Sequence, residues 1–172
     1  DNPKDLLFRS IFLDCAQLVH IVEDFDEVDK TNLFAIGGSQ GGALTYSTAA
    51  LCPQIKACCA SYPFLSDYKR VWEMDMAERA YFELKQFFRN FDPRHEHEDE
   101  IFYKLGYIDI QNLAPRIKGK MLMLTGLMDN ICPPSTQFAA FNKITSEKKV
   151  LFYHDFGHEN LPDSTVLALE WF

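Results

Sequence analysis

The sequence predicts an α/β fold built on a parallel sheet, and three apolar runs support that prediction. The first, at residues 33–36, leads into the glycine-rich stretch 37–42 and then into a segment with helical character, which predicts a strand, a tight turn and a helix. The other two runs, at 120–127 and 149–154, are each followed by a loop. Strands that alternate with helical segments indicate parallel pairing.

The first element in chain order is expected to be a helix. Asn2 is a favourable N-cap residue, Pro3 suits the first helical position, and Asp5 adds an acid to the first turn. One apolar face is predicted from residues spaced three or four apart, which are Leu7, Ile11, Cys15, Leu18 and Val22. We expect this face to pack on the sheet and the helix to end near Phe25.

The turn after the first strand matches the pattern G-x-S-x-G, in which a nucleophilic serine occupies a strained turn between strand and helix. Ser39 is the candidate nucleophile. Gly37 and Gly41 stand two residues to either side, where they are expected to keep side chains clear of the bend. The pattern alone is weak, because an ordinary glycine- and serine-rich β-turn has the same letters.

An acid and then a histidine follow the serine in the order that a catalytic triad on this fold requires. Asp129 comes after the second apolar run and His158 after the third. Either residue taken alone is explained as a loop-capping aspartate or a surface histidine. Together they predict an α/β-hydrolase fold with Ser39 as nucleophile, Asp129 as acid and His158 as base.

We call the turn at residues 37–41 the elbow. The segment between the elbow and Asp129 is predicted to hold a helix, a strand and an insertion. The helix at 40–51 is rich in small residues, which lets it pack closely beneath the serine. A buried strand follows over 55–62. From about 66 to 113 aromatic and charged residues predict a helical insertion. It either covers the core or forms a lid or subunit contact over the active site.

Composition narrows the classes of function. The 172 residues include 17 basic and 25 acidic side chains, a net charge of −8, without a basic stripe, so no nucleic-acid partner is expected. The sequence has no run of membrane-span length and no signal peptide, so no membrane partner is expected. Five cysteines, with Cys58 and Cys59 in an apolar run, fit reduced thiols in a cytoplasmic protein.

The run from His95 to Glu100 alternates histidines with acids and suggests a metal site at first sight. Adjacent acids are more typical of a solvated helix start, so no metal is expected. The sequence also lacks a glycine-rich phosphate loop, and no cofactor is expected.

Four stretches of the sequence look like the motifs of one family. They are GGSQGG at 37–42, NLAPRI at 112–117, GLMDNICPPST at 126–136 and GHE at 157–159. In these motifs the sequence resembles the acetyl xylan esterase / cephalosporin C deacetylase family, carbohydrate esterase family 7, within the α/β-hydrolases. Gln40 directly after the nucleophile and Glu159 directly after the histidine belong to this family's version. The resemblance spans nearly the whole chain.

The resemblance implies Ser39 as nucleophile, Asp129 as acid and His158 as base, with the Gln40 backbone N–H in the oxyanion hole. It implies a cytoplasmic serine esterase that needs no cofactor. Its substrates would be acetylated xylo-oligosaccharides and related small esters such as cephalosporin C. It also implies a homo-oligomer, often a hexamer whose active sites face an internal cavity.

Family members carry early strands, an Arg-Gly-Gln motif and a tyrosine whose backbone N–H is the second oxyanion donor. None of these is found in residues 1–172. We therefore expect a partial α/β-hydrolase domain, truncated at the N-terminus, with the second oxyanion donor absent from this chain. We also expect residues 33–36 to present an unpaired apolar edge.

Two other functions are compatible with the same residues. A serine peptidase of the prolyl-oligopeptidase type shares the elbow and the triad order. A non-catalytic hydrolase-fold fragment that binds partners through its aromatic insertion shares the fold.

Overall fold

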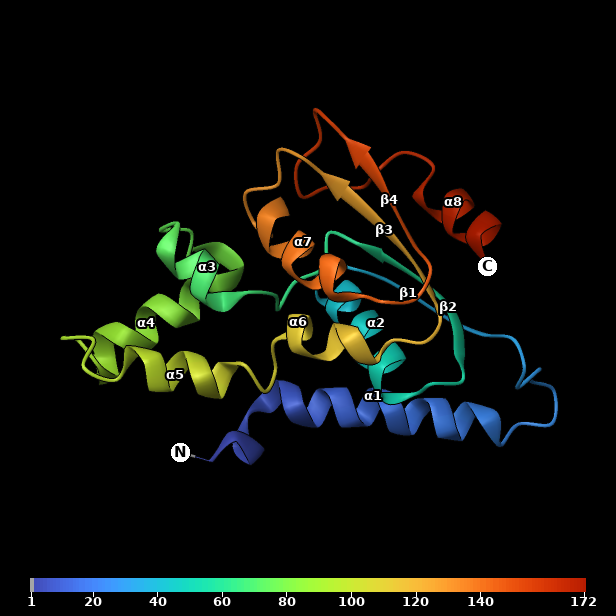
Figure 1. Ribbon diagram of the computed structural model, residues 1–172, viewed down its shortest axis with the longest axis horizontal. Coiled ribbons are helices and arrows are strands. Elements are labelled where there is room, and N and C mark those ends of the chain that lie inside the picture. The colour runs from blue at the N-terminus through green and yellow to red at the C-terminus, as the bar shows by residue number, and fades with distance from the viewer. Residues whose placement is uncertain (1) are drawn as a thin grey trace.

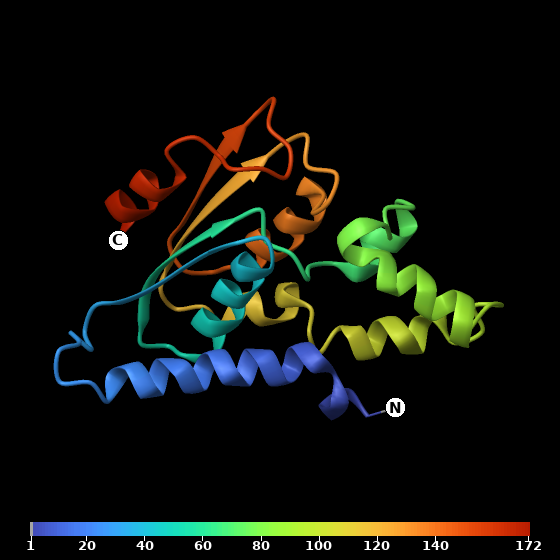
Figure 2. The same ribbon diagram turned by 180° about the vertical axis from the view of Figure 1, so that it is seen from behind.

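The computed structural model describes residues 2–172 as one parallel sheet with helices on both faces (Figures 1 and 2). The strands lie in the order in which they occur in the chain and each neighbouring pair is parallel, which confirms the predicted fold class. The strands are β1 (Leu33–Gly38), β2 (Ile55–Ser61), β3 (Lys120–Gly126) and β4 (Lys148–Tyr153).

Helices connect these strands and cover the sheet. They are α1 (Leu7–Glu23), α2 (Gln40–Leu51), α3 (Tyr68–Glu73), α4 (Phe82–Phe91), α5 (Glu98–Leu105), α6 (Ile110–Leu113), α7 (Pro134–Lys143) and α8 (Ser164–Trp171). Single 3₁₀ turns occur at Pro3–Asp5, Arg79–Tyr81 and Ala114–Arg116.

Side chains that alternate along β3 divide the core between the two faces of the sheet. Met121 and Met123 belong to the larger apolar cluster, which includes residues of α2 and α7. Leu122 and Leu124 belong to a smaller cluster beneath α8. All four side chains are buried. The continuous apolar run in β3 is what a strand covered on both faces requires.

The first helix differs from the prediction in its start and in its buried face. Asn2 caps only a 3₁₀ turn, and the chain is extended at Leu6 before α1 begins. Leu7 and Leu18 of the predicted face are 70% and 58% exposed, whereas Phe12 is 3% exposed. The helix packs mainly on α2 rather than on the sheet (Figure 1). The stripe that contains Phe12 is buried because it is the side of α1 that packs in the same core cluster as α2.

Among the described residues, β1 pairs with β2 alone and therefore forms an edge of the sheet. The side chains of Phe34 and Ile36 are 39% and 58% exposed. The Phe34 ring stacks on that of Phe172, with centroids 4.8 Å apart. The edge strand that carries the elbow thus presents apolar side chains on the same face as α8.

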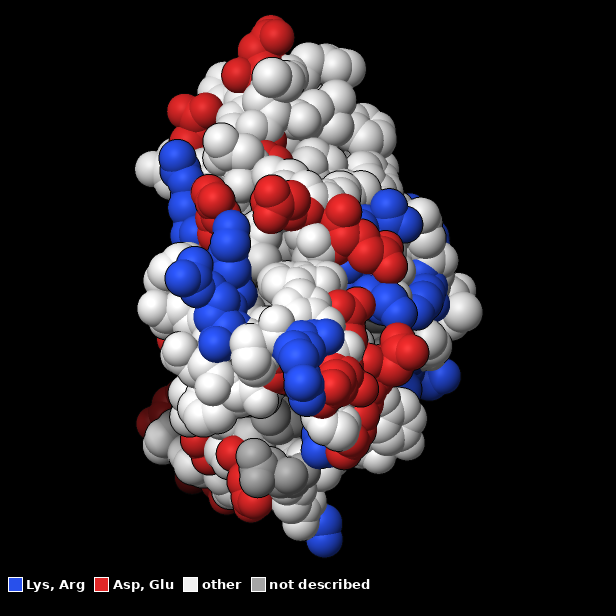
Figure 3. Space-filling model, turned by 90° about the vertical axis from the view of Figure 1, so that its left-hand side faces the viewer, with Lys and Arg blue, Asp and Glu red and all other residues white. Residues whose placement is uncertain are grey.

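Between β2 and β3 the chain forms α3 to α6, and α3, α4 and α5 extend away from the sheet (Figure 2). Aromatic contacts join these helices, since Trp72 stacks on Phe88 at 4.5 Å and Phe102 lies 5.8 Å from Phe88. On the face shown in Figure 3, basic and acidic side chains are interleaved. One ion pair, Lys69 to Asp99 at 3.0 Å, links α3 to α5.

Candidate active site

Ser39 occupies the sharp turn between β1 and α2. Its φ of 54° and ψ of −119° are rarely adopted by residues with a side chain, and such strain costs of the order of 1–3 kcal/mol. Backbone hydrogen bonds hold the turn in place. The Ser39 N–H donates to the Ser61 carbonyl at 2.9 Å, and the Ser39 carbonyl accepts from Phe64 at 3.0 Å and Ala43 at 3.1 Å.

The glycines around the turn serve different purposes. A Cβ on Gly37 would lie 2.3 Å from the carbonyl oxygen of Gly41, so the Gly41 backbone leaves no room for a side chain at Gly37. A Cβ on Gly41 would meet nothing within 4 Å, so the expectation that Gly41 keeps a side chain out of the bend is wrong. A Cβ on Gly42 would lie 3.0 Å from the backbone of Ser61 and Pro63, where α2 crosses the end of β2.

The structure brings together the three side chains predicted to form the triad. They come from the loops that follow β1, β3 and β4, whose carboxyl ends lie along one edge of the sheet. His158 Nε2 lies 2.9 Å from Ser39 Oγ, and His158 Nδ1 lies 2.9 Å from Asp129 Oδ2. Because a carboxylate only accepts, Nδ1 carries the proton and Nε2 of the neutral ring accepts from the serine hydroxyl.

The Asp129 carboxylate is fully buried and is held by its own loop. Its Oδ1 accepts backbone N–H groups from Ile131 and Cys132, each at 2.8 Å. Its Oδ2 accepts from His158 and lies 3.4 Å from Nε2 of Gln137. These donors satisfy a buried charge that would otherwise be costly. They also fix the direction in which the carboxylate faces the imidazole.

Two further groups border the nucleophile. Gln40 is the first residue of α2, where backbone N–H groups have no partner within the helix and the helix dipole favours negative charge. Its N–H is therefore suited to an oxyanion. Burial, with a smaller contribution from Asp129, raises the pKa of the Cys132 thiol to about 12, so this thiol stays protonated near neutral pH.

Tyr62 was not among the residues predicted from the sequence, yet its ring lies against the imidazole of His158. The ring centroids are 4.6 Å apart and the planes are inclined by 53°. Tyr62 has a φ of 36°, an unusual value for a residue with a side chain. The sequence feature that could have pointed to Tyr62 is its position at the end of the predicted buried strand next along the chain from the elbow.

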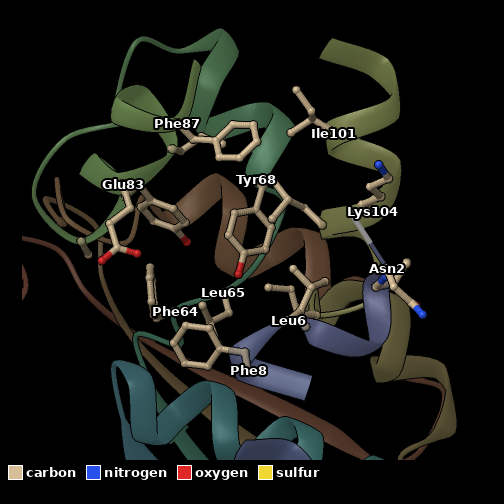
Figure 4. Close-up of a pocket in the computed structure, with 16 residues that line it drawn as sticks. Asn2, Leu6, Phe8, Phe64, Leu65, Tyr68, Glu83, Phe87, Ile101 and Lys104 are labelled. Atoms are coloured by element: carbon tan, nitrogen blue, oxygen red, sulfur yellow. The ribbon is translucent and has the colours of Figure 1, made fainter. Parts of the chain in front are cut away.

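A mostly apolar cavity of about 320 Å³ lies beside the site, between the start of α1 and the helices α4 and α5 (Figure 4). Phe64 links it to the nucleophile, because its N–H donates to the Ser39 carbonyl while its side chain lines the cavity. Tyr68 also lines the cavity (Figure 4), and its buried hydroxyl has no hydrogen-bond partner among the described residues.

Within residues 2–172, no group of three or more His, Cys, Asp or Glu side chains is placed to hold a metal ion. His95 instead packs within the insertion, its ring 4.9 Å from that of Phe88 and its Nδ1 3.1 Å from Glu98. No helix in the described part of the chain has both the length and the apolar character needed to cross a membrane.

Comparisons with known proteins support the resemblance found in the motifs. The family described as acetyl xylan esterase (AXE1) matches residues 1–172. Acetyl xylan esterase 1 from Thermoanaerobacterium sp. JW/SL YS485 is 53% identical, with a TM-score of 0.98 over 99% of this chain. The acetyl xylan esterase from Paenibacillus sp. R4 is 38% identical, with a TM-score of 0.94 over 98% of this chain. The acetyl esterase Axe7A of Xylanibacter ruminicola is 29% identical over 99% of this chain.

This chain spans only part of each relative. It covers 54% and 53% of the two solved esterases and 37% of Axe7A. More distant solved structures share the fold alone. One of them, the acylaminoacyl peptidase of Pyrococcus horikoshii, is 13% identical with a TM-score of 0.61 and matches over 94% of this chain.

Proposed function

We propose that this chain, which belongs to the acetyl xylan esterase (AXE1) family, supplies the nucleophile, base and acid of a serine esterase. Its substrates are acetylated xylo-oligosaccharides and related small esters such as cephalosporin C. The observation that carries the proposal is the unbroken hydrogen-bonded chain from Ser39 Oγ through His158 to Asp129, with 2.9 Å at each step.

In the first half of the reaction, Ser39 Oγ attacks the acetyl carbonyl carbon while His158 Nε2 takes the hydroxyl proton. Asp129 holds the imidazole in the required tautomer and stabilises the imidazolium. The tetrahedral intermediate then collapses. The bond to the sugar oxygen breaks, that oxygen takes the proton from His158, and acetyl-Ser39 remains.

In the second half, His158 takes a proton from a water molecule, whose oxygen attacks the acetyl-serine carbonyl. Collapse releases acetate and returns the proton to Ser39 Oγ. In both halves the negative oxygen needs preorganised donors, and the Gln40 N–H at the start of α2 is one of them. No step requires a cofactor.

The proposal also covers the cellular compartment and the oligomeric state of the enzyme. Five free cysteines, four of them buried, support a reducing cytoplasmic compartment. The exposed apolar side chains on β1 support contact with further protein, as in a homo-oligomer. Sedimentation velocity tests the assembly, and a hexamer is the state implied by the family resemblance.

Two measurements test the proposed activity against its rivals. Turnover of p-nitrophenyl acetate, acetylated xylo-oligosaccharides and cephalosporin C is compared with turnover of peptide anilides. Faster cleavage of the anilides would instead favour a serine peptidase. Labelling by a fluorophosphonate then asks whether Ser39 is activated at all, and unlabelled wild-type protein would favour a non-catalytic module.

A further inference from the structure

Gln137 is a fully buried amide beside the triad acid. It lies in the first half of α7, and its exposed fraction is 0%. Its Nε2 lies 2.6 Å from the carbonyl oxygen of Cys132 and 3.4 Å from Oδ2 of Asp129. The side chain therefore reaches back from the helix into the loop that carries the acid.

The chemistry of its neighbours fixes which way the amide faces. Both the Cys132 carbonyl and the Asp129 carboxylate are acceptors, so the group that faces them must be the NH₂ donor. A flipped amide would set its Oε1 against two oxygens. The contact with Asp129 is long, but its acceptor is charged, and donors to charged groups contribute more than donors to neutral ones.

Packing alone does not account for an amide at this position. With the NH₂ group turned to the acid loop, Oε1 of Gln137 is buried and has no hydrogen-bond partner among the described residues. A methionine has a similar shape and would fill the space without burying an unpaired acceptor. The amide therefore weakens the core at this position, while its NH₂ group supports the acid.

The two contacts of Gln137 act on both oxygens of the carboxylate. Oδ2, which it approaches directly, is the oxygen that accepts from His158. Oδ1 accepts from the N–H of Cys132, the residue whose carbonyl Gln137 holds. One side chain thus ties α7 to the carboxylate and to the loop that orients it.

We propose that Gln137 is a positioning residue for the triad, which holds Asp129 Oδ2 in line with His158 and fixes the loop that holds Oδ1. This inference rests on the proposed function, in which Asp129 is the catalytic acid. Gln137 touches neither substrate nor the reacting atoms, so its effect on the reaction passes through Asp129.

The test compares three variants of the chain. Gln137→Met removes the donor and keeps the volume, and Gln137→Glu replaces a donor with a group that is repelled by Asp129 when ionised. Thr136→Val is the matched control, because Thr136 is equally buried on the same helix and its hydroxyl donates to the Pro133 carbonyl at 2.7 Å without touching Asp129. Thermal unfolding verifies that each variant is folded, and Gln137→Leu replaces Gln137→Met if the latter is not.

We expect kcat for p-nitrophenyl acetate to fall about 10-fold in Gln137→Met and about 100-fold in Gln137→Glu, with little change in KM. Thr136→Val should stay within about 3-fold of wild type. In proton NMR, the downfield signal of the proton between His158 Nδ1 and Asp129 Oδ2 should shift or broaden in both Gln137 variants and stay in place in the control.

Wild-type kcat together with an unshifted downfield signal in Gln137→Met would overturn the inference. An equal loss in Thr136→Val would also overturn it, because the effect would then come from general loosening of the loop. The NMR signal separates this inference from the proposed function. If the wild-type chain cleaves no acetyl ester, the proposed function fails, while the signal still reports whether Gln137 positions the acid.

Discussion

The Tyr62 ring lies against the imidazole of His158, with centroids 4.6 Å apart and planes inclined by 53°. The contact places an aromatic π-system beside the one triad residue that gains a positive charge during the proposed reaction. Aromatic rings attract cations through their quadrupole, by about 0.5–2 kcal/mol depending on exposure. We therefore expect Tyr62 to hold the imidazole in place and to attract the imidazolium that forms during the proposed reaction.

Replacing Tyr62 tests this contribution. We expect Tyr62→Leu to lower kcat for p-nitrophenyl acetate about 10-fold, because the aromatic contact with the imidazolium is lost. Tyr62→Phe keeps the ring and should stay within about 3-fold of wild type. Steady-state kinetics measures both. A Phe variant as slow as the Leu variant would assign the effect to the hydroxyl instead of the ring.

Substitutions at Ser39 should separate catalysis from backbone strain. Ser39→Ala and Ser39→Gly both remove the nucleophile and should abolish acetate release. Glycine adopts a φ of 54° without a Cβ penalty, so Ser39→Gly should be more stable than Ser39→Ala by about 1 kcal/mol. Urea unfolding gives the difference. Equal stabilities would mean that the elbow stores no strain. Turnover at the wild-type rate in either variant would exclude Ser39 as nucleophile.

Much of the site was predictable because its residues follow strands in a fixed order. Ser39, Asp129 and His158 each follow an apolar strand, and parallel strands bring their carboxyl ends to one edge of the sheet. Tyr62 and Gln137 were not predicted. The position of Tyr62 depends on a backbone turn with positive φ. Gln137 was not predicted because glutamine is mostly found at the surface.

The buried face of α1 was not predictable from periodicity. Both the predicted stripe and the stripe that contains Phe12 have helical spacing. The choice between them depends on α2, the partner of α1 in the folded chain, which local sequence does not reveal. The open space at Gly41 likewise follows from the path of α2 rather than from the motif.

The two glycines that flank the elbow should respond differently to alanine. Gly37→Ala places a Cβ 2.3 Å from a backbone oxygen that cannot move away freely, so we expect a loss of about 3 kcal/mol or more in the free energy of unfolding. Gly41→Ala adds a methyl group to open space in a helix, where alanine is favoured over glycine by up to about 1 kcal/mol. Urea unfolding of both variants checks this. Similar losses in the two would show that the motif, and not local space, sets the requirement.

The last prediction concerns Asp109, a buried carboxylate in the insertion. Burial raises its pKa above the 3.8 of an exposed aspartate, against hydrogen bonds from Gln111 that act in the opposite direction. A raised folded-state pKa means that the folded chain binds a proton more readily than the unfolded chain. Asp109 therefore supports stability fully below pH 3.8, and this contribution is lost as pH rises through its folded-state pKa.

Asp109→Asn removes this titration and keeps a side chain that can cap α6. The free energy of unfolding of the wild type minus that of Asp109→Asn should fall as pH rises from about 3 to about 7, because the effects of acids that do not interact with Asp109 cancel in the difference. Urea unfolding across this range, followed by tryptophan fluorescence, gives the curve. A difference that rises with pH would show that the Gln111 hydrogen bonds outweigh burial and that the ionised form is the favoured one in the folded chain.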